Sequence, residues 1–360
     1  MYTYNFNAGP SALPPEVLQE AQAEFLNFQG IGASILEISH RSKHYETIHQ
    51  EAQQRIKQML ALSSEYEVLF LQGGASAQFS MLPINFLTKG KTAGYINSGA
   101  WSEKAWKEAQ KIGEAVVLAS GKDKQFQQLP NLQVQNIPEE LVYIHFASNE
   151  TIGGIQYKTY PKVGDIPLVA DMSSDIMSRP FDASQFSLIY AGAQKNLGPA
   201  GVTIVIVHRS LLDSIPESTP DMLNYAVQAA NQSLFNTPPV FSVYMMNLVL
   251  KWIEQHGGLE GMAARNQQKA DILYEVIDSS DGFYKGLAHK DSRSIMNITF
   301  GTESSEKEKK LLLELEQAGF IGLKGHRAAG HLRASIYNAV PYEHCKALAE
   351  FLVDFQRRNA

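Results

Sequence analysis

The segment Ser187-Leu-Ile-Tyr-Ala191, followed by Gly192-Ala-Gln-Lys-Asn-Leu-Gly198, joins a short apolar run to a glycine-bounded turn that carries a lysine. Short apolar runs with little alternation are typical of strands buried on both faces, as in a mostly parallel sheet covered by helices. Ligands of such open α/β sheets bind outside the carboxyl ends of the strands, where these turns lie. Three further runs end in this way: Val68-Leu-Phe-Leu71 before Gln72-Gly-Gly-Ala-Ser76, Tyr143-Ile-His-Phe146 before Ala147-Ser-Asn-Glu-Thr-Ile-Gly153, and Ile166-Pro-Leu-Val-Ala170 before Asp171.

Length and composition bound the class of protein. A chain of 360 residues predicts two domains, at roughly 150 residues each. Hydrophobic residues make up 44% and charged residues 19%, which is ordinary for a globular protein. The net charge of −6 gives no bulk electrostatic reason to bind nucleic acid or an anionic membrane. A bound anion must therefore meet a local cluster of cations.

Cysteine content and the absence of long apolar runs predict a cytoplasmic protein with no membrane partner. The single cysteine, Cys345, cannot form an intramolecular disulfide and excludes a cysteine-based zinc site. The first residues lack the basic and then apolar pattern of a signal peptide. The purest apolar run, Val202–Val207, is far shorter than the ~20 residues of a membrane helix.

Two histidines, His40 and His44, have the spacing of metal ligands on one helical face. The segment lacks the glutamate that follows the first histidine in zinc hydrolases, and Arg41 and Lys43 would repel a cation. We therefore predict no metal site.

The chain changes character near Gly282, from alternating strands and helices to a small α+β pattern. His256-Gly-Gly258 is a plausible boundary. We expect a large domain over 16–256 and a small domain formed by 1–15 and 257–360. The elements expected in the last part are a strand at 295–300, a charged helix at 306–318, a strand at 332–336 and a closing helix after 341.

The four turns together match the needs of pyridoxal 5′-phosphate. Its aldehyde requires a lysine, for which Lys195 is the candidate, and its pyridine nitrogen requires a carboxylate, for which Asp171 is the candidate. Its phosphate requires backbone N–H groups at a helix start, such as the one after Gly73-Gly74. Glycine and alanine around Lys195 would let a cofactor approach the backbone.

Each of these signals also has an ordinary structural interpretation. A lysine after a strand is usually a solvated loop residue, and Asp171 alone is more often a turn cap. Gly73-Gly74 without a Walker lysine is more often a tight turn, and Trp101 is more often a core aromatic. The joint placement at strand ends favours the cofactor.

Several motifs spread over nearly the whole chain are specific for one family. They are Asn7-Ala-Gly-Pro-Ser-Ala-Leu-Pro14, Ser39-His-Arg-Ser42, Gln72-Gly-Gly-Ala-Ser76, Ala191-Gly-Ala-Gln-Lys-Asn-Leu-Gly-Pro199, Phe235-Asn-Thr-Pro-Pro239, and Lys324-Gly-His-Arg327 with Arg333-Ala-Ser-Ile-Tyr-Asn-Ala339. On these residues the chain resembles the phosphoserine aminotransferases, class V aminotransferases of fold type I. The resemblance implies a large domain with a mostly parallel seven-stranded sheet and a small α+β C-terminal domain.

The resemblance also implies the roles of individual residues. Lys195 would hold the cofactor as a Schiff base and move the proton between Cα and C4′, while Asp171 would pair with the ring nitrogen. Thr151 would contact the ring hydroxyl, and Trp101 would stack on the ring. The phosphate contacts would come from Ala75, Ser76 and Gln194, and from Asn236 and Thr237 of a second subunit in a homodimer with shared sites.

The substrates implied by the resemblance are glutamate and 3-phosphohydroxypyruvate, which are anions that require local cations. The residues expected to bind them are His40, Arg41, His326, Arg327 and Arg333, because guanidinium forks match carboxylate and phosphate groups. The chain departs from some family members, which carry an arginine at the position of Ser76. The substrate phosphate therefore has one cation fewer.

Alternatives stay open at this point. The chain could be another class V aminotransferase for a different small 2-oxo acid, a cysteine desulfurase, or a protein that keeps the fold without turnover. A nucleotide-binding protein is disfavoured because neither a Gly-x-Gly-x-x-Gly fingerprint after a strand nor a Walker lysine is present. For Thr237, an ordinary helix N-cap is the alternative, since Pro238 follows it.

Overall fold

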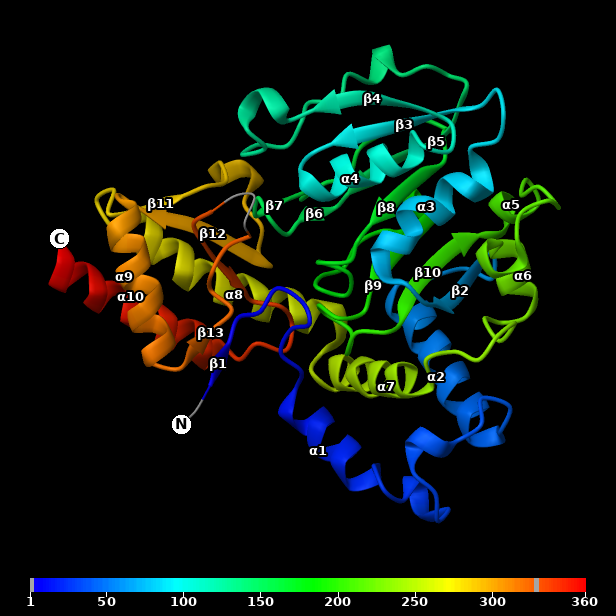
Figure 1. Ribbon diagram of the computed structural model, residues 1–360, viewed down its shortest axis with the longest axis horizontal. Helices are drawn as coiled ribbons and strands as arrows, with labels where there is room; N and C mark the ends of the chain where they lie inside the picture. Colours follow the sequence, from blue (N-terminus) through cyan, green and yellow to red (C-terminus); the bar gives the residue numbers. More distant parts are fainter. Residues whose placement is uncertain (1–2, 327–329) are drawn as a thin grey trace.

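A seven-stranded sheet forms the centre of the larger part of the protein, which is described by a computed structural model over residues 3–326 and 330–360 (Figure 1). The strand order is β2-β10-β9-β8-β5-β3-β4. β10 runs antiparallel to both of its neighbours, and the other strands are parallel to one another. This confirms the predicted mostly parallel sheet. The strands are β2 (Tyr66–Leu71), β3 (Thr92–Asn97), β4 (Glu114–Ser120), β5 (Leu141–Ala147), β8 (Leu168–Asp171), β9 (Leu188–Gly192) and β10 (Thr203–His208).

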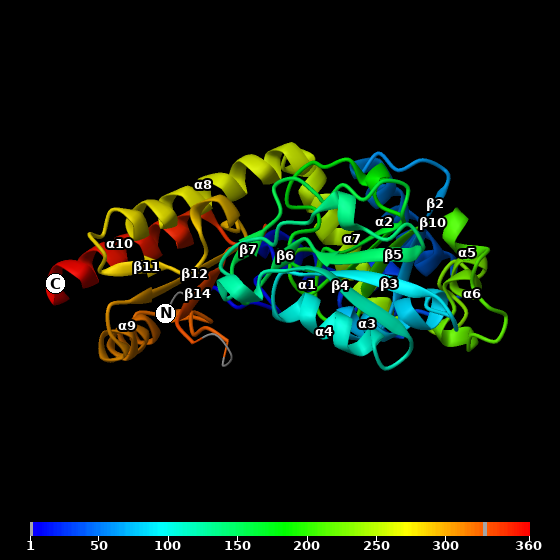
Figure 2. The same ribbon diagram turned by 90° about the horizontal axis from the view of Figure 1, so that it is seen from above.

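Helices cover both faces of this sheet, as Figure 2 shows from above. In β2, Val68 and Phe70 belong to the core on one face, and Leu69 and Leu71 belong to the core on the other. Burial on both faces explains why the strands lack apolar–polar alternation. One face packs against α1 (Pro15–Glu24), α2 (Lys43–Met59) and α7 (Val240–Gln255), and the other against α3 (Gly74–Phe86), α4 (Ala100–Ala109) and α6 (Tyr225–Ala230), with α5 (Arg209–Leu212) after β10.

A second, smaller assembly has its own hydrophobic core, to which Phe6 of the N-terminal arm contributes. A three-stranded antiparallel sheet carries α8 and α10. The arm joins it through a two-residue parallel pairing of β1 with β13. The elements are β1 (Tyr4–Asn5), α8 (Gly258–Asp278), β11 (Tyr284–Gly286), β12 (Asn297–Thr302), α9 (Ser305–Gln317), β13 (Phe320–Ile321), β14 (Leu332–Ser335) and α10 (Tyr342–Asn359).

The small hairpin of β6 (Asn149–Glu150) and β7 (Ile155–Gln156) lies between the two assemblies. Asn149 donates to Asn297 Oδ1 at 2.8 Å on β12, and Thr299 of the same strand donates to the Gly153 carbonyl at 3.0 Å. These bonds fix the smaller assembly against the end of β5, and so against the edge of the sheet where β5, β8 and β9 end. Within the residues described, none of the helices combines the length and apolar character that a membrane span needs.

Candidate active site

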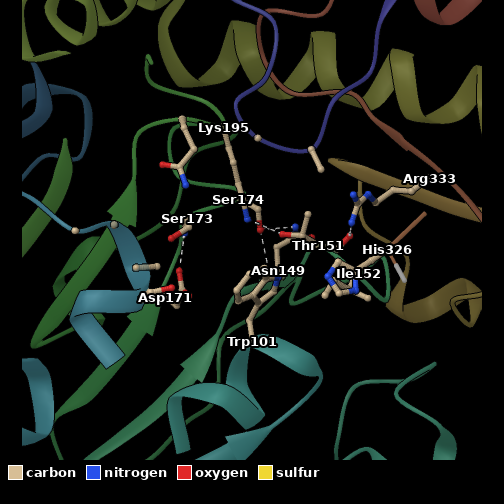
Figure 3. Close-up of a pocket in the computed structure, with 17 residues that line it drawn as sticks. Trp101, Asn149, Thr151, Ile152, Asp171, Ser173, Ser174, Lys195, His326 and Arg333 are labelled. Atoms are coloured by element: carbon tan, nitrogen blue, oxygen red, sulfur yellow. Dashed lines mark hydrogen bonds between the residues drawn. The ribbon is translucent and has the colours of Figure 1, made fainter. Parts of the chain in front are cut away.

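A cavity of about 380 Å³ opens at the carboxyl ends of β5, β8 and β9, beside the smaller assembly (Figure 3). Its position is the one expected for a ligand site in an open α/β sheet. The cavity brings together most of the predicted site residues, from seven separate stretches of the sequence. The lining residues are Ala8, Gly9, Gly73, Gly74, Ala75, Ser76, Trp101, Asn149, Thr151, Ile152, Asp171, Ser173, Ser174, Gln194, Lys195, His326 and Arg333.

The N-terminal arm fixes the backbone of the loop that follows β9. Ser11 N donates to the Gln194 carbonyl at 3.0 Å, and Ser11 Oγ donates to the Lys195 carbonyl at 2.5 Å. Gly9 has φ +137°, and a Cβ there would lie 3.2 Å from Lys195 Cγ. A side chain at this position would therefore strain the backbone and crowd the lysine stem. The motif around Gly9 thus has a structural purpose that the sequence did not reveal.

Lys195 places its amine in the centre of the cavity. Its Nζ donates to Thr151 Oγ1 at 2.7 Å and lies 5.6 Å from the centroid of the Trp101 ring. Burial lowers the pKa of Lys195 to about 8, and the carboxylate of Asp171 opposes this change. The neutral amine, which a nucleophile toward an aldehyde requires, is therefore present in equal amount with the charged form near pH 8.

Asp171 ends β8 and is only 7% exposed. Its Oδ1 accepts from Ser173 N at 2.9 Å, so Asp171 does cap the turn that follows β8. Burial raises the pKa of Asp171, and the Ser173 hydrogen bonds and the charge of Lys195 oppose the rise. In the described part of the chain, no Lys, Arg or His nitrogen lies within 4.0 Å of its carboxylate. The protein thus presents a buried acid without a direct counter-ion.

The start of α3 forms another wall of the cavity. Gly73 and Gly74 have φ +91° and +64°, and a Cβ at Gly73 would lie 2.5 Å from that of Ala77. Ala75 and Ser76 occupy the first turn, where backbone N–H groups have no partner within the helix and favour an anion. Gln194 lines the same cavity.

Trp101 is held in place by a buried carboxylate that the sequence did not single out. Glu150, which is 1% exposed, accepts from Trp101 N at 3.0 Å and from Ser102 N at 2.9 Å. These bonds satisfy the first N–H groups of α4. Because Thr151 follows Glu150 directly, the same short segment positions both the indole and the hydroxyl that contacts Lys195.

Arg333 enters the cavity from β14 of the smaller assembly. Its Nη1 donates to the Thr151 carbonyl at 3.4 Å, and its Nε is buried with no hydrogen-bond partner among the residues described. Such an orphaned donor next to an open cavity fits an anionic ligand. His326 also lines the cavity, as Figure 3 shows, whereas Arg327 lies outside the described residues.

Four predicted site residues do not line this cavity. His40 and Arg41 lie in the loop before α2, with Arg41 exposed, and Asn236 and Thr237 lie before α7. The carbonyl of Thr237 accepts from the Gln72 side chain at 3.1 Å. The N-cap alternative for Thr237 is wrong, because α7 begins at Val240 and the residue at its N-cap is a proline, two positions later.

Comparison with known proteins agrees with this geometry. The family model for aminotransferase class-V matches residues 3–348. A phosphoserine aminotransferase of Geobacillus kaustophilus is 56% identical over 357 residues, 99% of each chain. The solved structure of phosphoserine aminotransferase from Bacillus circulans subsp. alkalophilus has a TM-score of 0.97 at 54% identity, covering 100% of this chain and 99% of its own. The pyridoxal phosphate-bound phosphoserine aminotransferase of Trichomonas vaginalis has a TM-score of 0.90 at 34% identity, covering 98% and 100%.

The fold and the site define a class V aminotransferase. Within that class, the chain belongs to the phosphoserine aminotransferase family. The cofactor of these enzymes is pyridoxal 5′-phosphate. The residues present fit it: a buried carboxylate without a counter-ion suits a protonated ring nitrogen, a buried amine of lowered pKa suits an aldehyde, and the start of α3 suits a phosphate.

The lowered pKa of Lys195 gives a first prediction. In the cofactor-free protein, the neutral fraction of this amine should rise with pH through a midpoint near 8, because burial disfavours the charged form. Reductive methylation with formaldehyde, followed by peptide mass spectrometry across a pH series, reports the neutral fraction of every lysine at once. Lys346, which is exposed, serves as an internal control.

The variant Asp171→Asn sharpens this test. Removing the carboxylate should move the Lys195 midpoint to lower pH, because Asp171 favours the protonated amine. A midpoint for Lys195 that coincides with that of Lys346 would show that the amine is not desolvated.

Proposed function

We propose that the protein transfers an amino group reversibly from L-glutamate to 3-phosphohydroxypyruvate, giving O-phospho-L-serine and 2-oxoglutarate in alternating half-reactions. Its relatives named phosphoserine aminotransferase match it over 98% or more of its length at 50–56% identity. The observation that carries the proposal is the half-buried Lys195 amine, whose Nζ lies 2.7 Å from Thr151 Oγ1 in a cavity that also presents Arg333. We propose that this reaction serves serine biosynthesis. We also propose that the same site accepts the related phosphorylated substrate of pyridoxine biosynthesis.

The chain's own residues divide the chemical tasks. When bound, pyridoxal phosphate accepts the amino group of one substrate, because its protonated ring delocalises the electron pair released at Cα. Asp171 keeps the ring nitrogen protonated, because the positive charge of that nitrogen offsets the cost of burying the Asp171 carboxylate. Lys195 moves the proton between Cα and C4′ as a general base of suitable pKa, and Thr151 orients it. Trp101 covers the ring face.

Separate groups of residues bind the anionic groups of the cofactor and of the substrates. Ala75, Ser76 and Gln194 bind the cofactor phosphate at the start of α3. Arg333 binds the α-carboxylate common to both amino acids, which would give its unpartnered Nε an acceptor. The residues proposed to bind the remaining carboxylate or phosphate are His40, Arg41, His326 and Arg327.

We further propose a homodimer in which Asn236 and Thr237 complete the phosphate site of the partner subunit. Both residues lie outside the cavity of their own chain, just before α7. In sequence, α7 follows these two residues. Its first turn and the region of α1 form an apolar groove that includes Phe25, Leu26 and Phe241. Leu26 is 81% exposed, which is typical of a surface that another chain covers. The proposed homodimer is a closed two-fold assembly, in which each of the two active sites is built from both subunits.

Other features support the remaining parts of the proposal. The separate core around Phe6 supports the division into a large domain of 16–256 and a small domain of 1–15 and 257–360.

Burial raises the pKa of Cys345 to about 12 inside α10, which makes this thiol unsuitable as the mobile nucleophile of a desulfurase. A single cysteine is compatible with the reducing cytoplasm.

A screen of single half-reactions tests the proposed substrate. The purified holoenzyme is mixed with phosphoserine, glutamate, serine or alanine, and the visible absorbance of the cofactor is followed. Phosphoserine and glutamate should change it rapidly, whereas serine should react at least about tenfold more slowly, because it leaves the phosphate-binding cations unpaired. Serine reacting as fast as phosphoserine would refute the proposed substrate, and a colour change with none of the four would indicate a fold without turnover.

Hybrid dimers test the shared site. One subunit carries Lys195→Ala and a first affinity tag, and the other carries Asn236→Ala with Thr237→Ala and a second tag. Each homodimer should be nearly inactive, whereas a hybrid purified over both tags holds one intact site and should show about half of the wild-type activity. A hybrid as inactive as its parents would show that the loop serves its own chain.

A further inference from the structure

Lys104 lies one turn after Trp101 on α4 and reaches across to α3. Its Nζ donates to Ser76 Oγ at 3.3 Å, and it lies 5.6 Å from the centroid of the Trp101 ring and 5.8 Å from that of Phe79. Aromatic faces attract ammonium groups through the ring quadrupole. An otherwise exposed lysine is therefore held with its charge beside Ser76, a residue that lines the active-site cavity.

The charge of Lys104 is not balanced by a carboxylate. Within the described ranges, no Asp or Glu oxygen lies within 4.0 Å of its Nζ. By contrast, Lys107 on the same helix pairs with Glu103 at 3.0 Å, and Lys111 just beyond it pairs with Glu108 at 2.8 Å. The first turn of α3, which Lys104 approaches, contains no acidic residue. The one lysine of this group that contacts a cavity-lining residue is thus the one without a counter-ion among the described residues.

Two positive features meet at this wall of the cavity. The start of α3 carries a positive partial charge from its free N–H groups, and the ammonium of Lys104 adds a full charge one side chain away. Like charges at this distance are unfavourable unless an anion lies between them. A phosphate monoester carries about two negative charges and three acceptor oxygens, so it can accept from backbone N–H groups, a hydroxyl and an ammonium at once.

We propose that Lys104 is a phosphate-binding residue of the active site, whose ammonium contacts a phosphate monoester seated at the first turn of α3 together with Ser76. This inference rests on the proposed function, which supplies two such groups, the cofactor phosphate and the substrate phosphate. It also accounts for the serine at position 76, where some family members carry an arginine, since the positive charge comes from α4 instead.

The test compares Lys104→Met, which keeps the apolar stem against both rings, with Lys104→Arg, which keeps the charge. Lys107→Met is the matched control, because it removes the same charge from the same helix. Cofactor retention is measured without substrate, from the visible absorbance of each holoenzyme dialysed against buffer of increasing volume. KM is then measured separately for phosphoserine and for glutamate, and circular dichroism verifies that each variant is folded.

Lys104→Met should bind a phosphate group about tenfold more weakly, the loss expected for one charged hydrogen bond. Weaker cofactor retention would assign the contact to the cofactor, whereas a raised KM for phosphoserine alone would assign it to the substrate. Lys104→Arg and Lys107→Met should match the wild type. The proposal is overturned if Lys104→Met matches Lys107→Met in both measurements, or if KM rises equally for both amino acids while cofactor retention is unchanged. Cofactor retention is measured without substrate and so does not depend on the proposed reaction. A wild-type enzyme that does not react with phosphoserine would therefore refute the proposed function without deciding the role of Lys104.

Discussion

The burial of two opposite charges at the ends of neighbouring strands is the constraint on which the rest of this site depends. β8 and β9 are parallel and paired, so Asp171 and the loop that carries Lys195 leave the sheet at the same edge. Burial disfavours both charges: it raises the pKa of Asp171 and lowers that of Lys195. A cofactor with a protonated ring and an electrophilic aldehyde relieves both costs. The site is thus poised for that cofactor before any substrate arrives.

The remaining parts of the structure surround this pair and hold it in position. The N-terminal arm packs Gly9 and Ser11 against the Lys195 loop, while its first residues pair with the smaller assembly. The smaller assembly in turn delivers Arg333, whose Nη1 reaches the Thr151 carbonyl. A movement of the smaller assembly would therefore change the distance between the Arg333 guanidinium and the Lys195 amine.

The sequence predicted the parts of the fold and site that depend on short-range patterns. Apolar runs located the strands, and residues at strand ends, such as Asp171, Thr151 and Lys195, were found because parallel strands end at one edge. The antiparallel direction of β10 could not be predicted, since an apolar run reads the same in either direction. Two-residue pairings such as β1 with β13 leave no periodic signal. Glu150 and Lys104 make their contacts with elements distant in sequence, which no local pattern records.

The most direct test of the central claim is the identity of the residue that holds the cofactor. Reduction of the holoenzyme with borohydride, followed by proteolysis and mass spectrometry, locates the covalently fixed pyridoxal group. The label should fall on Lys195 alone, and Lys195→Ala should retain no fixed cofactor although it still folds, because Lys195 is the one lysine among the described residues that lines the cavity. A label on a different lysine, or fixed cofactor in Lys195→Ala, would contradict the assignment of the site.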